Sequence, residues 1–355
     1  MRFRLFLYRI ILLLGCLPAL ETIAQEIPGP SAIVDTLVLQ NDLFEEEDPM
    51  VITLKFDITG YQRNRREDAY LPAELIYHLN DTLDIHKNIR LKPRGNFRRN
   101  FCSMPPFWLN IRKADLQNIH LQDVKRMKVV THCNGGKAAG DYVLKEYLAY
   151  RIYQSLSPFS FRARLVQMKY IDTGRKNRIT ESWAFVIEPE ALLVQREDMY
   201  SVKNDKLAMV HMLPEDMDRV ALFQYMIGNA DYSVAGRHNL KLIGQKEIGV
   251  EGFIPVPYDF DYSGLVDADY AVPGENLGLR SVRERYYMGP CRDQESYQKT
   301  VDLFREKQTE ILQLVEDFPY LDRRNKSGVR SYLEEFFNLA DRPEVLHRNT
   351  HRTCQ

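Results

Sequence analysis

One polar stretch of the sequence reads GNADYSVAGRHNLKLI from Gly228 to Ile243 and directly follows an apolar segment that is expected to be helical. It supplies an aspartate, Asp231, then a short polar loop, then an asparagine, Asn239, and finally the strand-like run LKLI. A second stretch begins at Ile254 and reads IPVPYDFDYSG, which is an apolar strand followed by two aspartates. The sequence therefore places acids and an amide at the ends of neighbouring elements.

These residue types are the ones that phosphoryl transfer from a nucleotide requires. An aspartate in a loop accepts the proton of the attacked hydroxyl, while an asparagine and a second aspartate hold Mg²⁺ through oxygen atoms. The two stretches offer Asp231, Asn239, Asp259 and Asp261 for these tasks. Each residue alone is explained as a turn or cap residue. Their order along the chain favours one shared site.

The order Asp, Asn, strand and Asp-Phe-Asp resembles the catalytic loop and metal-binding strand of kinase-like folds. Upstream, IRLKPRGN over Ile89–Asn96 followed by FWLNI over Phe107–Ile111 is similar to the strand–RGN–strand pattern of the CotH family of secreted and spore-coat protein kinases. The helix expected over Tyr142–Tyr153 and the strand AFVIE, which ends at Glu188, fit the same pattern. The resemblance covers Ile89 to Gly264, and there is a weaker likeness to HipA-type kinases.

The resemblance implies a two-lobed kinase-like fold with Mg²⁺ and ATP as cofactors. It implies a catalytic base at Asp231 and metal ligands at Asn239 and Asp259, with support from Asp261. Glu188 corresponds to the glutamate that ends the strand before the lobes join, and it is a candidate nucleotide-binding residue. Asp231 and Asn239 are eight positions apart, against five in the protein-kinase loop, so the segment between them is expected to bulge outward.

The cations that would hold a nucleotide are less clearly marked. After the RGN strand, where the family has a lysine, the sequence reads SMPP. Lys128, on the strand MKVV, is the best substitute, and Lys92 is the second choice. Arg94 is expected to bind phosphate oxygens. Arg98 and Arg99 are expected to form a solvated basic turn.

The N-terminus has the features of a secretory signal peptide. A basic start, MRFR, precedes a short apolar run and a cleavage position after Ala24, so residues 1–24 are expected to be removed. Two alternatives stay open: a lipoprotein processed at Cys16 and thereby attached to a membrane, and a retained anchor, which Arg9 disfavours. The protein is expected to be exported to the periplasm or the extracellular space.

Export changes the interpretation of the cysteines. Removal of the signal peptide leaves Cys102, Cys133, Cys291 and Cys354, an even number in an oxidising compartment. Cys102 and Cys133 flank the strand pair expected at residues 107–111 and 127–131, which favours the pairing Cys102–Cys133 and Cys291–Cys354. A metal site is disfavoured because no C-x-x-C spacing occurs.

Composition and periodicity indicate an α+β protein with a β-rich N-terminal part and a helical C-terminal part. The chain has 355 residues, of which 45% are hydrophobic and 27% charged, as in ordinary folded proteins. The expected division is a β-rich segment over 25–88, a kinase-like N-lobe over 89–190 and a helical C-lobe over 191–355. Helices are predicted over 141–156, from Pro214 to a stop at Gly228, over 297–318 and over 328–339.

The small net charge of the chain argues against one class of partner. A formal net charge of -1 argues against a nucleic-acid partner, because dedicated binders carry a strong basic excess. The expected function is Mg²⁺-dependent phosphoryl transfer from a nucleotide to a hydroxyl of a protein or a small molecule. The alternative is a catalytically inactive kinase-like scaffold that serves in envelope binding or assembly. A transferase that uses a different donor on a sugar or peptide is a third possibility.

Overall fold

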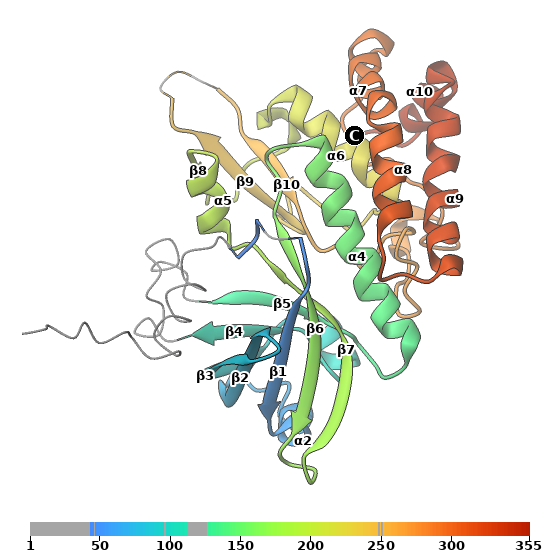
Figure 1. Cartoon of the computed structure of the whole chain (residues 1–355). Helices are drawn as coiled ribbons and strands as arrows, with labels where there is room; N and C mark the ends of the chain where they lie inside the picture. The colour runs from blue at the N-terminus through green and yellow to red at the C-terminus, as the bar shows by residue number, and fades with distance from the viewer. Residues whose placement is uncertain (1–42, 46, 96, 112–125, 248, 250) are drawn as a thin grey trace, which may run out of the picture.

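The computed structural model describes residues 43–45, 47–95, 97–111, 126–247, 249 and 251–355. The predicted signal peptide and Cys16 lie outside the described residues. The described chain has a β-rich N-terminal part and a helical C-terminal part, as the sequence predicts (Figure 1). Within this part of the chain no helix combines the length and the apolar character needed to cross a membrane.

The N-terminal part is a closed barrel whose strands follow the order β1-β2-β3-β4-β5-β7-β6. All neighbours pair antiparallel except β1 and β6, which pair in parallel and close the barrel. The strands are β1 Met50–Phe56, β2 Leu71–Asn80, β3 Leu83–Pro93, β4 Phe107–Ile111, β5 Met127–Thr131, β6 Ala163–Asp172 and β7 Arg178–Ile187. Leu54, Leu91, Phe107 and Val129 are among the fully buried side chains of its core.

The barrel corrects the predicted division of the N-terminal part. The boundary expected between residues 88 and 89 falls inside β3, and β1 pairs with both β2 and β6. The strands of the segment 25–88 therefore belong to the same sheet as those of 89–190. The physical reason is that β1 has both of its edges hydrogen-bonded, so it cannot form a separate layer.

The C-terminal part packs helices against a small sheet of order β10-β9-β8. The sheet consists of β8 Met199–Ser201, β9 Leu240–Gln245 and β10 Ile254–Pro257. The α-helices among the described residues are α2 Ile58–Arg63, α3 Phe97–Phe101, α4 Lys137–Leu156, α5 Glu190–Arg196, α6 Pro214–Ile227, α7 Gln294–Glu306, α8 Gln308–Asp317, α9 Arg323–Ala340 and α10 Pro343–His351. Helix α4 contacts both β7 of the barrel and α8, so it joins the two parts (Figure 1).

Local signals in the sequence predicted both ends of α6. Pro214 begins α6, and Gly228 ends it in the left-handed conformation with a φ of 67°, as predicted. The single helix predicted over 297–318 is in fact two, α7 and α8, which meet at Lys307. Each of the two helices buries its own apolar face.

Both predicted disulfides are present. Cys102–Cys133 joins the end of α3 to the connection between β5 and α4, and Cys291–Cys354 joins the loop before α7 to the C-terminus. Such bonds persist in oxidising compartments, which is compatible with an exported protein. The first bond lies beside Arg98, whose importance for the site is described below.

Replacement of Cys102 and Cys133 together by serine should lower the free energy of unfolding by roughly 3–4 kcal/mol. The bond closes a loop with a sequence separation of 31, and its removal restores the conformational entropy of that loop to the unfolded chain. Urea unfolding of the oxidised wild type and the double variant measures the change. A difference below about 1 kcal/mol would contradict the expectation.

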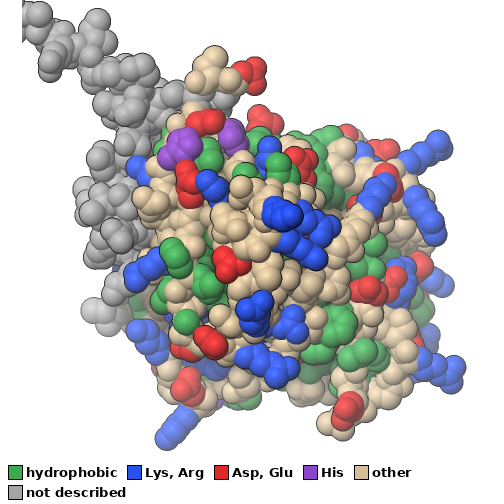
Figure 2. Space-filling model, turned by 90° about the horizontal axis from the view of Figure 1, so that it is seen from below, with side chains coloured by type: hydrophobic (Ala, Val, Ile, Leu, Met, Phe, Trp, Pro, Cys, Tyr) green, Lys and Arg blue, Asp and Glu red, His purple; other side chains and the backbone are tan. Residues whose placement is uncertain are grey.

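Charge is unevenly distributed although the net charge is small. Figure 2 shows the face at the lower end of the barrel, where Lys and Arg side chains gather over the middle. Exposed cations at this end come from α2, the turn after it and the β6–β7 hairpin, and include Arg63, Arg66, Arg175 and Lys176.

Candidate functional site

The polar residues predicted as a site converge because β9 and β10 are antiparallel neighbours. Leu240, the first residue of β9, pairs with Pro257, the last residue of β10. Asn239 precedes the first strand and Asp259 follows the second, so both lie at the same edge. The Tyr258 N–H donates to the Asn239 carbonyl at 3.0 Å and closes this edge.

The long spacing between Asp231 and Asn239 is absorbed by a small closed loop. Ser233 and His238 exchange two backbone hydrogen bonds of 3.0 Å, and the intervening residues turn outward. Asn239 Nδ2 consequently reaches Asp231 and donates to its carbonyl at 2.8 Å and to its carboxylate at 3.0 Å. His238 Nε2 lies 2.9 Å from the other oxygen of the Asp231 carboxylate. The expected bulge thus holds Asp231 in place.

A cluster of three carboxylates lies beside this loop. Glu146 of α4 joins Asp259 and Asp261, and one oxygen of each lies within 4.8 Å of the others. Glu146 is 1% exposed and Asp261 is 4% exposed. Glu146 Oε1 has no hydrogen-bond partner among the described residues. A buried acceptor without a partner is costly, so this atom is a candidate ligand for a cation.

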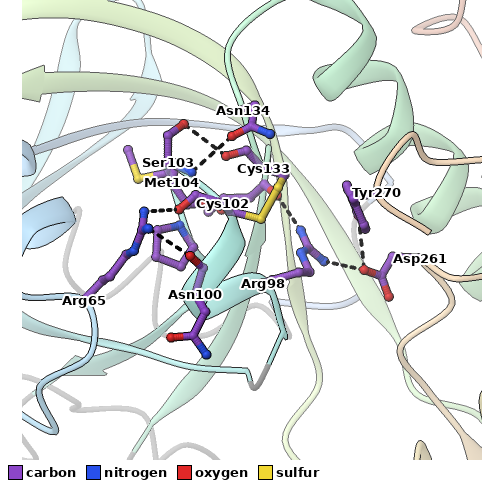
Figure 3. The surroundings of a disulfide bond; sticks show 12 residues. Arg65, Arg98, Asn100, Cys102, Ser103, Met104, Cys133, Asn134, Asp261 and Tyr270 are labelled. Atoms are coloured by element: carbon purple, nitrogen blue, oxygen red, sulfur yellow. Dashed lines mark hydrogen bonds and ion pairs between the residues drawn. A yellow bond between two sulfur atoms is a disulfide. The ribbon is translucent and has the colours of Figure 1, made fainter. Parts of the chain in front are cut away.

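Arg98 is part of this carboxylate cluster, and the prediction that it belongs to a solvated turn was wrong. Its Nη1 lies 3.4 Å from Asp261 and 3.6 Å from Glu146, and its Nη2 donates to the Thr131 carbonyl at 2.7 Å. Tyr270 donates to the same Asp261 oxygen at 3.1 Å (Figure 3). Two buried acids draw the guanidinium inward, because ions are stable in the interior only when paired.

Burial also sets the protonation of the acids. It raises the pKa of Asp261 to about 6, with Arg98 opposing the shift and Asp259 adding to it. Burial and the charge of Asp261 raise the pKa of Glu146 well above its usual range. The cluster therefore holds more negative charge than its surroundings readily accommodate.

Two cations approach the cluster from the barrel. Lys128 of β5 and Arg94, which follows β3, lie over the same Trp108 ring at 5.9 and 5.8 Å, and the Lys128 ammonium lies 3.9 Å from the Tyr258 ring centroid. Burial and the Arg94 charge lower the pKa of Lys128 to about 7, while Asp259 opposes the shift. Among the described residues neither side chain forms an ion pair.

Glu188 has other partners. Its carboxylate accepts from the Arg162 N–H at 3.0 Å and pairs with Arg196 Nη2 at 3.0 Å. These contacts fix the chain where β7 leaves the barrel. Arg99, the neighbour of Arg98, donates to the backbone carbonyls of Arg65 and Arg66.

Glu146 was not predicted as a site residue, although its position in the sequence carries a signal. It lies three residues after Val143 and four before Tyr150, both fully buried, so it occupies the apolar stripe of α4. A glutamate in such a stripe requires a partner in the interior. Helical periodicity identifies the position, but it does not say which residues the partner groups come from.

The donor set fits a hard divalent cation. Carboxylate oxygens are the preferred ligands of Mg²⁺, and the partnerless Glu146 Oε1 supplies a free one. Three carboxylates against the Arg98 guanidinium leave a formal charge of -2 when all groups are ionised. Asn239 uses its amide nitrogen on Asp231, which leaves its oxygen for a ligand.

Both Asn239 and Asp259 have positive φ angles, of 51° and 67°. Asparagine and aspartate tolerate this left-handed conformation better than other residues with a β-carbon. An asparagine is therefore a better substitute for Asp259 than an alanine when the carboxylate charge is to be tested.

His132, next to Cys133, predicts a loss of stability in acid. Burial and the Arg98 charge lower the pKa of His132 from 6.5 to about 4, and its ring packs 5.4 Å from that of Tyr170. As the pH falls, the unfolded chain binds a proton at His132 before the folded chain does. The contribution of His132 to stability is therefore present above pH 6.5 and is lost as the pH falls towards 4. Between pH 7 and pH 5 the loss should be roughly 2 kcal/mol.

Denaturant unfolding of the wild type and of His132→Phe at pH 7 and pH 5 measures the loss. The variant keeps an aromatic ring beside Tyr170 but cannot titrate. Its stability should fall less on acidification, by the amount given above. An equal fall in both proteins would contradict the assignment to His132.

Comparisons with known proteins add little to this geometry. No protein-family model matches the chain, and no curated protein matches its sequence. Among solved structures, the crystal structure of a Helicobacter pylori proinflammatory kinase CtkA is similar, with a TM-score of 0.37 and 11% sequence identity. The match covers 73% of this chain and 94% of that chain. At this TM-score the similarity supports no conclusion about function.

Proposed function

We propose that this protein is an exported, metal-dependent kinase that transfers the γ-phosphoryl group of ATP to a hydroxyl. The observation that supports it best is the carboxylate cluster of Glu146, Asp259 and Asp261, in which one buried oxygen has no hydrogen-bond partner among the described residues. Beside it lie two cations, Lys128 and Arg94, that form no ion pair within the same part of the chain. Oxygen ligands for Mg²⁺ and cations for phosphate oxygens are what a metal–nucleotide complex requires.

Each group has a role in the transfer. Asp231, held by His238 and Asn239, takes the proton of the acceptor hydroxyl. The acceptor oxygen then forms a bond to the γ-phosphorus, while the bond from that phosphorus to the β–γ bridging oxygen breaks and ADP leaves. Asp259 and Glu146, with Asp261 behind them, would hold Mg²⁺, which supplies neutralisation of phosphate charge.

Lys128 and Arg94 would hold the phosphate groups. Arginine binds two oxygens at once through its planar guanidinium, and lysine acts as a point charge. The low pKa of Lys128 reflects its burial and the nearby charge of Arg94, which outweigh the opposing charge of Asp259. Bound phosphate would restore its charge and thereby gain binding energy.

Calorimetric titration with ATP, with and without Mg²⁺, tests the proposal. Binding should require the metal, and Asp259→Asn should weaken it by about ten- to a hundredfold, as losses of metal-site groups do. Asp269→Asn, an exposed aspartate later in the same loop, serves as the matched control and should bind like the wild type. If Asp259→Asn binds Mg²⁺–ATP as tightly as the wild type, the assignment of Asp259 as a metal ligand is wrong.

A second function, a binding or assembly scaffold without turnover, is favoured by Arg98. Its guanidinium already pairs with two of the three carboxylates and supplies positive charge at the cluster. In that case the wild type should bind no Mg²⁺, and Arg98→Met should acquire Mg²⁺ binding. If the protein is a kinase, the unsubstituted wild type should bind Mg²⁺ together with ATP.

A further inference from the structure

Next to the carboxylate cluster lies a cavity that has no role in the function proposed above. It has a volume of about 270 Å³, and its walls include Asp231 and Tyr262. Tyr262 directly follows Asp261, and the charges of Asp261 and Asp231 both act on its hydroxyl. The cavity therefore opens at the group that would take the acceptor's proton.

We propose that this cavity binds a small amino polyol, such as an amino sugar, as the acceptor, which rests on the proposed kinase function. The phosphorylated group would be one of its hydroxyls, and its ammonium would lie against the acidic walls. The transfer itself is the balanced step given above, with the hydroxyl proton passing to Asp231.

The charge of the walls favours a cation. Asp231, Glu275 and Glu284 line the cavity, and no Lys or Arg does so among the described residues. Glu284 accepts a hydrogen bond from the Arg280 N–H at 2.9 Å and forms no ion pair with a side-chain cation within the described part of the chain. A concave surface of one sign concentrates ligands of the opposite sign.

Two neighbouring arginines, Arg283 and Arg285, are engaged elsewhere. Arg283 lies over the Tyr332 ring, at 4.6 Å, and pairs with Asp267 at 3.4 Å. Arg285 stacks on the same ring at 3.9 Å and pairs with Glu335 at 3.2 Å. Both of these cations thus have partners outside the cavity, so they do not neutralise Glu275 and Glu284. Asp231 is already held by His238 and Asn239.

Size and wall chemistry favour a small ring compound. Pockets for drug-sized ligands measure about 300–1,000 Å³, so this cavity suits one pyranose ring better than a nucleotide. Tyr262, Leu279 and Val282 give it an apolar side. An aromatic face packs against the C–H face of a sugar and attracts a nearby ammonium.

Three matched probes test the inference without nucleotide: glucosamine, glucose and N-acetylglucosamine, each titrated into the full chain by calorimetry. Glucosamine should bind about tenfold more tightly than glucose, since each partly exposed ion pair contributes up to about fivefold. The double variant Glu275→Gln with Glu284→Gln should reduce this preference to about twofold. Glu306→Gln, an exposed glutamate of α7, is the matched control and should keep it.

The outcomes separate this inference from the proposed function. Preferential binding of glucosamine that the double variant loses supports the inference, whether or not phosphate is transferred afterwards. Equal affinity for all three sugars, or no binding at all, overturns it. Mg²⁺-dependent ATP binding, measured separately, tests the kinase, so a failure of one is not a failure of the other.

Discussion

Asp231→Asn should lower the rate of phosphoryl transfer by about 10²- to 10⁴-fold, which is the contribution of a general base. An asparagine has the size of the aspartate and an oxygen that can still accept from Asn239, so the loop keeps its shape. It has no basic oxygen for the proton. The rate is measured as ADP formation from Mg²⁺–ATP.

Binding must be unchanged for this result to be informative. The affinity of Asp231→Asn for Mg²⁺–ATP and its free energy of unfolding should match the wild type, because the substitution touches neither the carboxylate cluster nor the core. Asp205→Asn, an exposed loop aspartate, controls for a change of surface charge. An undiminished rate in Asp231→Asn would show that this residue only shapes the loop.

Arg98→Met should destabilise the fold by about 3–5 kcal/mol, the usual cost of leaving a buried ion without its partner. Glu146 and Asp261 would both lose the guanidinium that lies 3.6 and 3.4 Å away, and the Thr131 carbonyl would lose a donor. Methionine keeps the apolar stem of the arginine, so packing changes little. Denaturant unfolding measures the effect.

The effect should depend on pH in a defined direction. Burial raises the pKa of both acids in the folded state, so the contribution of these two groups to stability is complete below pH 4 and is lost as the pH rises through about 6 for Asp261. Without Arg98 the pKa of each acid rises further, and the destabilisation of the variant is larger at pH 8 than at pH 5.

Two further variants test whether the loss of the buried ion pairs causes the destabilisation of Arg98→Met. Adding Glu146→Gln to Arg98→Met should recover part of the stability, since one buried charge is removed. Arg99→Met, at the next position, loses only hydrogen bonds to backbone carbonyls and should cost about 1 kcal/mol. If both single arginine variants cost the same, the buried ion pairs are not what stabilises this region.

Local patterns in the sequence were sufficient for much of the fold. Strands Phe107–Ile111 and Met127–Thr131 have the predicted bounds, because alternation and apolar runs reflect contacts made by the strands themselves. The helix end at Gly228 is also set by local sequence, and the predicted cysteine pairs are present, with Cys102 and Cys133 flanking the strand pair β4 and β5. The barrel was not predicted, because a parallel pair such as β1 and β6 joins strands far apart in the sequence.

The sequence by itself determined the order of Asp231, Asn239 and Asp259. The strands β9 and β10 follow one another closely in the sequence, and their antiparallel pairing brings Asn239 and Asp259 to the same edge. Only the tertiary structure added Glu146 and Arg98, since α3, α4 and the loop after β10 meet through packing. A buried charge is stable only beside its partner, so those residues acquire their chemistry from neighbours that no local spacing encodes.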